Sequence, residues 1–283
     1  MKINVICPLY NAANYVLPLH RSLCVQTGVD VEITYILTPS DDNTAEILQK
    51  NQIAYTPIGV GEFSHSLTRE KFALQSTADI LVFITQDIQI RDPEWLKKLT
   101  QPLISGECAA AFARQVAIHK GIEKYTREYN YPAISFINSQ DDIAVKGLKA
   151  FAFSDAASAV KADVFRTVNG YDGKDMPFNE DMYLAHKIIT RGYRIKYCAD
   201  AVVYHSHRLT LKQLYKRYYL AGRSMALNPE LDQYGTTKAG GSLAKYVLKA
   251  ALKHFDLWAL LCFIPNMTAR YLGMRKGRAS VKG

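Results

Sequence analysis

The sequence predicts an α/β fold in which a mostly parallel, Rossmann-like central sheet is flanked by helices and followed by a C-terminal helical extension. Two observations support this. Through the first 115 residues, strand-like apolar runs alternate with helix-like amphipathic stretches. The run at residues 80–85 (Ile-Leu-Val-Phe-Ile-Thr) is typical of a parallel strand buried on both faces. No GxGxxG or Walker sequence occurs, so neither a dinucleotide-binding fold nor a P-loop NTPase is supported.

The individual elements follow from the same periodicity. We expect strands at residues 2–9, 31–37, 54–58, 80–85 and 109–114. We expect helices between them at residues 16–26, 44–51, 66–75 and 93–104, the last with Pro93 at its start. Residues 116–160 are less regular and carry polar and aromatic patches. From Asp163 order resumes with a helix, a second helix at 179–191, two short strands and a basic helix at 209–223.

Length and composition limit the classes of protein. A chain of 283 residues with 48% hydrophobic and 22% charged residues fits one large domain, or one domain with a modest appendage. The net charge of +9 favours anionic partners such as a nucleotide diphosphate or an anionic lipid surface. No nucleic-acid-binding motif is present, so we expect no nucleic-acid partner. The five cysteines show no CxxC spacing, which is typical of a reducing cytosol, and we find no signal-peptide pattern.

Acidic and histidine side chains fall at the ends of predicted elements. Glu180 and Asp181 open the helix at 179–191, where Asn179 can serve as N-cap and the helix dipole favours a carboxylate. His205 and His207 follow a strand and share one face of it, as a metal or anion site needs. Asp87 follows the buried strand at 80–85, at the sheet edge where ligands collect. Taken singly, each is more simply read as a helix-terminus acid, a surface or core histidine, or a turn aspartate.

Residues 240–283 have a different character. Apolar and aromatic positions alternate with lysines, and a basic tail follows. A basic amphipathic segment of this kind can lie in a membrane interface. The alternative is a helix packed on the domain or on a partner subunit, and the sequence leaves both open.

Together these motifs resemble glycosyltransferase family 2, of GT-A fold, and within it the bacterial rhamnosyltransferases. The match runs from Pro8 to about Arg223. It rests on Pro8-Leu9-Tyr10-Asn11, Phe63 to Arg69, Phe83 to Asp87, Ala113-Arg114-Gln115, Asn179 to Met182, His205-Ser206-His207, and Lys216 to Tyr219 with Gly222. The resemblance implies a GT-A domain at 1–225, with a nucleotide-binding half at 1–115 and an acceptor-binding half at 116–225. A basic amphipathic helical region follows at 226–283.

The resemblance also implies roles for individual residues. Asp181 corresponds to the catalytic base and Glu180 to a residue that positions the acceptor or the base. Asp87 corresponds to the last acid of the metal-binding motif, and His205 or His207 would complete the coordination of Mg²⁺ or Mn²⁺. The donor-binding residues implied are Pro8, Tyr10 and Asn11 at the nucleotide end, His65 and Arg69 along the diphosphate, and Gln86 and Arg114.

Two departures from the family pattern bear on the donor. The strand at 31–37 is not followed at once by an acid, so Asp41 or Asp42 would have to replace the residue that usually holds the base and ribose. The loop after His65 reads Ser66-Leu67-Thr68-Arg69-Glu70, where the family usually has glycines.

The expected reaction is an inverting transfer of L-rhamnose from dTDP-L-rhamnose to a polysaccharide or lipid-linked oligosaccharide in cell-surface glycan synthesis. A UDP-linked donor is one alternative, and a catalytically silent sugar-nucleotide or membrane-surface binding module is another. We expect a cytoplasmic location, peripheral on the inner face of the membrane. Whether the chain forms a homodimer stays open.

Overall fold

The computed structural model describes residues 1–281, with the backbone alone at Thr237 and Lys238. Within this part of the chain one mixed sheet has eight strands in the order β3-β2-β1-β4-β7-β5-β8-β6. The strands are β1 (Lys2–Leu9), β2 (Asp30–Leu37), β3 (Thr56–Pro57), β4 (Ile80–Ile84), β5 (Ala110–Val116), β6 (Phe136–Asn138), β7 (Ala157–Lys161) and β8 (Ile195–Tyr204). Strands β3, β2, β1 and β4 run parallel, β7 lies antiparallel between β4 and β5, and β5 and β8 are again parallel. The predicted mostly parallel sheet flanked by helices is therefore confirmed.

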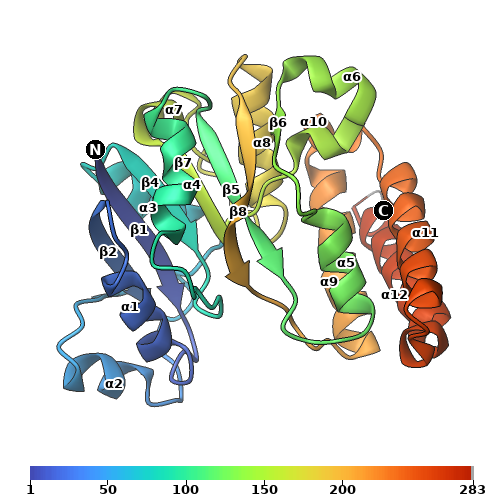
Figure 1. Cartoon of the computed structure of the whole chain (residues 1–283), viewed down its shortest axis with the longest axis horizontal. Coiled ribbons are helices and arrows are strands. Elements are labelled where there is room, and N and C mark those ends of the chain that lie inside the picture. The colour runs from blue at the N-terminus through green and yellow to red at the C-terminus, as the bar shows by residue number, and fades with distance from the viewer. Residues whose placement is uncertain (282–283) are drawn as a thin grey trace.

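Helices cover both faces of this sheet (Figure 1). The α-helices are α1 (Val16–Cys24), α2 (Thr44–Lys50), α3 (Leu67–Gln75), α4 (Trp95–Ile104), α5 (Ile122–Asn130), α6 (Ile143–Lys146), α7 (Ala162–Thr167), α8 (Glu180–Thr190), α9 (Leu211–Leu227), α10 (Pro229–Asp232), α11 (Thr237–Lys253) and α12 (Leu257–Ala279). Short 3₁₀ turns occur at Gln140–Asp142 and Gly147–Phe151. The alternation of β1 sends Val5 and Cys7 into one core with α1 and α4, and Ile6 into another with α3, α7 and α8.

Three expectations for the strands need correction. The two short strands expected before His205 are one strand, β8. The pairing of β8 with β5 shifts register between Ala113 and Arg114, and this irregularity accommodates the polar Asp200 without a turn. The irregular stretch 116–160 contains the start of a central strand, β7, whose small residues carry little of the β-branched signal that marks strands. The strand expected at 54–58 is confined to Thr56–Pro57.

Helix ends differ from the expectation by a few residues, as is common. Helix α4 starts at Trp95, two residues after Pro93, and α9 runs from Leu211 to Leu227. The expected boundary at residue 225 thus falls inside α9, and the division into domains stays a prediction.

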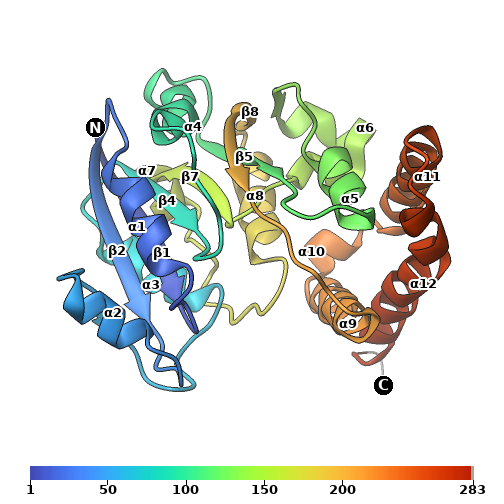
Figure 2. The same cartoon turned by 60° about the horizontal axis from the view of Figure 1, so that its bottom comes forward.

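The C-terminal extension is helical, as predicted, and α11 and α12 lie beside α5 and α9 (Figure 2). Helix α12 approaches α9 closely because glycines occupy the crossing. A Cβ added to Gly277 would lie 1.9 Å from the backbone oxygen of Tyr219, and one added to Gly222 would lie 2.2 Å from the oxygen of Met274. No helix in the described residues is long and apolar enough to cross a membrane.

Candidate active site

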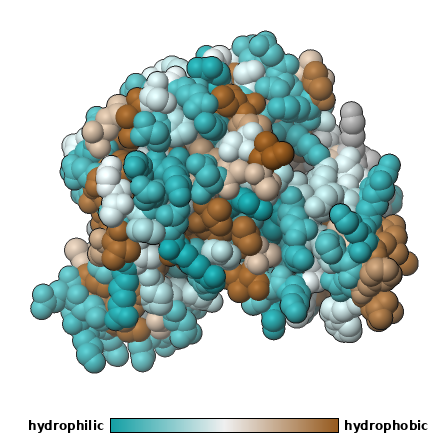
Figure 3. Space-filling view, viewed as in Figure 1, coloured by the Kyte–Doolittle hydropathy of each residue, from teal (hydrophilic) through white to brown (hydrophobic). Residues whose placement is uncertain are grey.

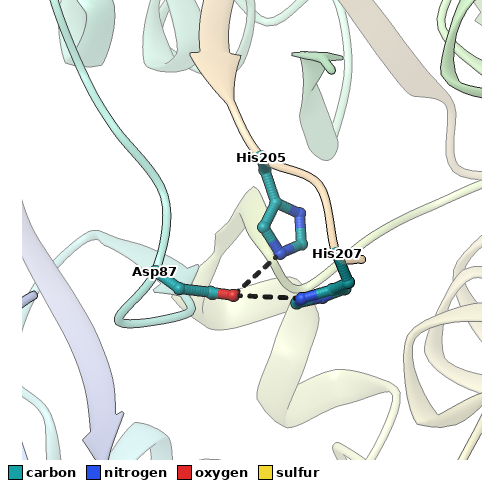
Figure 4. Close-up of side chains that lie close together, drawn as sticks. All are labelled: Asp87, His205 and His207. Carbon is teal, nitrogen blue, oxygen red and sulfur yellow. Dashed lines mark ion pairs between the residues drawn. The ribbon is translucent and has the colours of Figure 1, made fainter. Parts of the chain in front are cut away.

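The segment after β4 and the end of β8 are joined by a two-residue antiparallel bridge. The amide of Gln89 donates to the carbonyl of Tyr204 at 2.9 Å, and the amide of Tyr204 donates back to Gln89 at 2.9 Å. This bridge brings Asp87 beside the histidines that follow β8. The nearest ring nitrogens of His205 (Nε2) and His207 (Nδ1) lie 3.4 and 3.5 Å from Asp87 Oδ2 (Figure 4). The sequence left open whether His205 or His207 accompanies Asp87, and the structure places both beside it, so the role of each as a ligand stays a prediction.

The chemistry of this cluster fits a divalent cation. One ligand atom from each of Asp87, His205 and His207 lies within 4.8 Å of the others. Burial opposes ionisation of Asp87, but the neighbouring His205 outweighs that effect and holds the pKa of this carboxyl well below the usual range. Burial, together with neighbouring His205, lowers the pKa of His207 to about 4, so its imidazole is neutral near pH 7 and has a lone pair to offer. A carboxylate and two imidazoles form a donor set of the kind that binds metals.

A second cluster gathers buried carboxyl groups around Arg69. The Arg69 guanidinium is 3% exposed, lies 3.5 Å from Glu180 Oε1 and donates to the carbonyl of His65 at 2.6 Å. Asp155, which the sequence reading missed, is also buried here and accepts from the hydroxyl of Tyr171 at 2.6 Å. Arg69 is thus buried and paired with Glu180, whereas the resemblance implies a position along the diphosphate of the donor.

Burial dominates the acid–base properties of these carboxyl groups. Desolvation raises the pKa of Glu180 and of Asp155. It raises the pKa of Asp181 well above the usual range, and the charges of Glu180 and Asp155 add to that effect. Asp181 is therefore set up to accept a proton, as a general base must.

Asn179 does not cap α8, contrary to the prediction. It adopts a left-handed conformation with φ of 63°, which asparagine tolerates better than most residues, and its side chain makes no cap hydrogen bond. Its amide instead donates to the carbonyl of Ala221 in α9 at 3.3 Å. The hydroxyl of Ser224 donates to the carbonyl of Phe178 at 2.5 Å, so α9 holds the residues that precede Glu180.

Helix α9 also presents Arg217 to the site. Its guanidinium lies 5.3 Å from the centre of the Phe178 ring and, among the described residues, has no carboxylate partner. The positive charge of Arg217 acts, after burial and nearer charges, to lower the pKa of both Glu180 and His207. The charge of Arg217 is therefore felt by groups of both clusters.

The loops after β1 and β4 are tied together. The side chain of Gln86 accepts from the amide of Tyr10 at 2.8 Å and donates to the carbonyl of Tyr10 at 2.6 Å. The ring of Tyr10 is 56% exposed, and its neighbour Asn11 adopts a φ of 50°. Pro8 is half-buried near the end of β1 and belongs to the same group. In this group the exposed ring of Tyr10 lies beside the loop that carries Asp87.

Three further predicted residues lie apart from this group. Asp42 accepts from the amide of Ala13 at 2.9 Å and from the hydroxyl of Thr44 at 2.6 Å, so its carboxylate already organises this loop. His65 is exposed, with its ring 5.0 Å from that of Phe63. Arg114 lies on β5, and its buried Nε has no hydrogen-bond partner within the described residues.

Comparisons with known proteins show the family of this chain. The sequence model of glycosyl transferase family 2 matches residues 4–168. The O-antigen chain rhamnosyltransferase RfbN of Salmonella typhimurium is 29% identical over 98% of this chain and 90% of its own length. The O-antigen chain rhamnosyltransferase WbaN of Salmonella anatum is 30% identical over 89% of this chain and 81% of its own.

Solved structures share the fold at lower identity. The mannosyltransferase PcManGT of Pyrobaculum calidifontis, solved with GDP-Man and Mn²⁺, has a TM-score of 0.62 at 17% identity, over 99% of this chain and 86% of that one. S. aureus TarS 1–349, solved with UDP, has a TM-score of 0.58 at 14% identity, over 100% of this chain and 91% of that one. On the family match, the related sequences and the shared fold, this chain belongs to glycosyl transferase family 2.

Proposed function

We propose that this chain is an inverting, metal-dependent glycosyltransferase that moves L-rhamnose from dTDP-L-rhamnose to a growing cell-surface glycan. The observation that carries the proposal is the presence of two clusters, a metal-type set at Asp87 and a proton-accepting carboxylate at Asp181, with groups of both influenced by the charge of Arg217. Both relatives are named O-antigen chain rhamnosyltransferases, which supports the sugar and the class of acceptor.

Each residue has a distinct task in this proposal. Asp181 takes the proton from the acceptor hydroxyl as that oxygen attacks the anomeric carbon, and Glu180, held by Arg69, positions the acceptor or the base. Arg217 and the exposed Tyr10 lie where the diphosphate and the nucleoside can approach, with Arg217 offering a planar fork of donors.

The cation would be held by Asp87 with His205 and His207, and when bound it offsets charge on the departing nucleoside diphosphate. Mg²⁺ prefers oxygen ligands, whereas imidazole suits transition metals. We therefore expect Mn²⁺ to bind more tightly than Mg²⁺. PcManGT, of the same fold, was solved with Mn²⁺.

The test is donor turnover with Asp181→Asn and a matched control. Asp181 accepts from the amide of Met182 at 2.7 Å, and Asp163 at the start of α7 accepts from Val164 at 2.7 Å in the same way. Asp163→Asn removes the same negative charge from a carboxylate with the same kind of local bond outside the site, and it should keep activity. Asp181→Asn should lower transfer by roughly 10²–10⁴-fold while nucleotide binding remains.

The outcomes separate the alternatives. Turnover of a UDP-sugar in preference to dTDP-L-rhamnose overturns the donor assignment. Binding of nucleotide sugars without turnover of any of them favours a catalytically silent binding module. Equal activity of Asp181→Asn and Asp163→Asn refutes the assignment of the base.

We further propose that the junction of α11 and α12 rests on an anionic membrane surface on the cytoplasmic side. Phe255 is 86% exposed, and Leu257 and Trp258 are each 71% exposed. Apolar residues of this region form part of the brown surface at the edge of the molecule (Figure 3). Exposed lysines accompany them on α11, at positions 245, 249 and 253. Exposed aromatic side chains accompanied by lysines match the chemistry of an anionic bilayer interface.

Sedimentation with anionic vesicles tests this surface. Phe255→Ser combined with Trp258→Ser should lose vesicle binding, and Val145→Ser on α6, which is 80% exposed, is the matched control. Retained vesicle binding by the double variant refutes the membrane proposal. A change from dimer to monomer in the same variant would assign this surface to a homodimer instead.

A further inference from the structure

Gln115 lies in the interior beside the metal-type cluster and connects it to helix α5. It is 1% exposed, and its Oε1 lies 2.9 Å from Nδ1 of His205. The same oxygen accepts a short hydrogen bond from Nη1 of Arg127 in α5. Its Nε2 donates to the hydroxyl of Ser154 at 2.9 Å. Every polar atom of this buried amide is therefore engaged.

The partners determine which way the amide points. A guanidinium can only donate hydrogen bonds, so the Gln115 atom that faces Arg127 must be the oxygen. Arg127 is in turn held by Glu123, whose Oε1 accepts from Nε of Arg127 at 2.8 Å. The orientation of Gln115 thus follows from chemistry and does not depend on distinguishing oxygen from nitrogen by position.

The amide orientation then determines the state of one nitrogen of His205. Because Oε1 of Gln115 can only accept, Nδ1 of His205 must carry the proton of their 2.9 Å contact. The other nitrogen, Nε2, faces Asp87 at 3.4 Å. A cation at this cluster needs the Nε2 lone pair, and a ring whose neutral form has its proton on Nδ1 supplies it.

We propose that Gln115 is a positioning residue for the metal: it holds the His205 ring so that Nε2 is the ligand atom directed at the cation. The inference rests on the proposed metal site and goes beyond it, because it assigns which nitrogen of His205 binds. Gln115 does not touch the cation. Its effect passes through the hydrogen bond to Nδ1, and Glu123 and Arg127 keep its oxygen in place.

The experiment measures Mn²⁺ affinity from the electron paramagnetic resonance signal of the free ion, without donor or acceptor. Gln115→Met removes the acceptor oxygen and should weaken Mn²⁺ binding by roughly 10–100-fold. Gln115→Glu returns an oxygen that faces His205 and Arg127, and it should recover most of that affinity. Gln26→Met is the matched control, because Gln26 also makes several hydrogen bonds, among them 3.0 Å to the carbonyl of Ser22 and 2.8 Å from the amide of Leu96.

A second readout is independent of the metal and of variant folding. In wild-type protein labelled with ¹⁵N-histidine, Nδ1 of His205 should carry a proton in long-range ¹H–¹⁵N spectra. An unprotonated Nδ1 overturns the inference. Equal Mn²⁺ affinity of Gln115→Met and wild type also overturns it while the metal site stands, whereas wild-type protein that binds no Mn²⁺ overturns the metal site and the inference together.

Discussion

The crossing of α9 and α12 leaves no space for a side chain at Gly277, so Gly277→Ala should destabilise the protein. The added Cβ would lie 1.9 Å from the carbonyl oxygen of Tyr219 and 2.9 Å from the amide nitrogen of Arg223. Carbon and oxygen normally approach to about 3.3 Å, so α12 would have to move away by roughly 1.4 Å. Both clashing groups are backbone, and no rotamer change can relieve them.

The magnitude follows from two opposing effects. Overpacking of this kind costs about 1–3 kcal/mol, and the backbone clash favours the upper end. Replacement of glycine by alanine within a helix returns about 1 kcal/mol. A net loss of about 2 kcal/mol corresponds to a fall of roughly 3–4 °C in the midpoint of thermal unfolding for a chain of this size.

Gly241→Ala is the matched control on α11. Among the described residues, a Cβ at Gly241 meets nothing within 4 Å, so this variant should gain stability of about 0.5–1 kcal/mol. Thermal unfolding followed by circular dichroism compares the two variants. If Gly277→Ala unfolds at or above the midpoint of Gly241→Ala, the reasoning about the α9–α12 crossing is wrong. The expected result would show that the C-terminal helices support the fold.

The other predictions concern the charged groups of the site. Because burial raises the pKa of Asp181, its ionised form is lost as pH falls through that raised value. The value of kcat/KM should therefore fall toward acid pH with an apparent pKa above the usual carboxyl range. The same acid fall in Asp181→Asn contradicts this. Asp87→Asn should weaken Mn²⁺ binding by at least about 10-fold, whereas Asp41→Asn on the exposed loop should leave it unchanged, as isothermal titration can show. Burial opposes ionisation of Asp42, but hydrogen bonds led by that of Thr44 lower its pKa to about 2, so its contribution to stability is present above about pH 4 and is lost as pH falls toward 2. Denaturation at several pH values should therefore find Asp42→Asn less stable than wild type at neutral pH and equal to it near pH 2, and a constant difference would count against this.

Local pattern predicted much of the fold. The alternation of Lys2–Leu9 and the apolar run ending at Ile84 carry their periodicity in adjacent residues, and both strands appear as expected. Strand β7 was missed because its small residues have weak intrinsic preference, and its place between β4 and β5 depends on pairing with strands far along the chain. Asn179 illustrates a different failure. Asparagine is a favoured N-cap residue, but the hydrogen bond to Ala221 in α9 accompanies a left-handed backbone at Asn179.

The candidate site, like the fold, could be predicted only in part from the sequence. Residue type, with a strand-end position for Asp87, His205 and His207 and a helix-start position for Asp181, was enough to nominate these residues, because each carries its chemistry in its own side chain. The enclosure of Arg69, the carboxyl of Asp155 and the link through Gln115 depend on which segments the fold brings together. Burial, amide orientation and the identity of a histidine ligand atom are set by neighbours that are distant in sequence. The sequence by itself therefore determined the family and nominated the reacting groups, and only the tertiary structure decided how those groups are charged, oriented and supported.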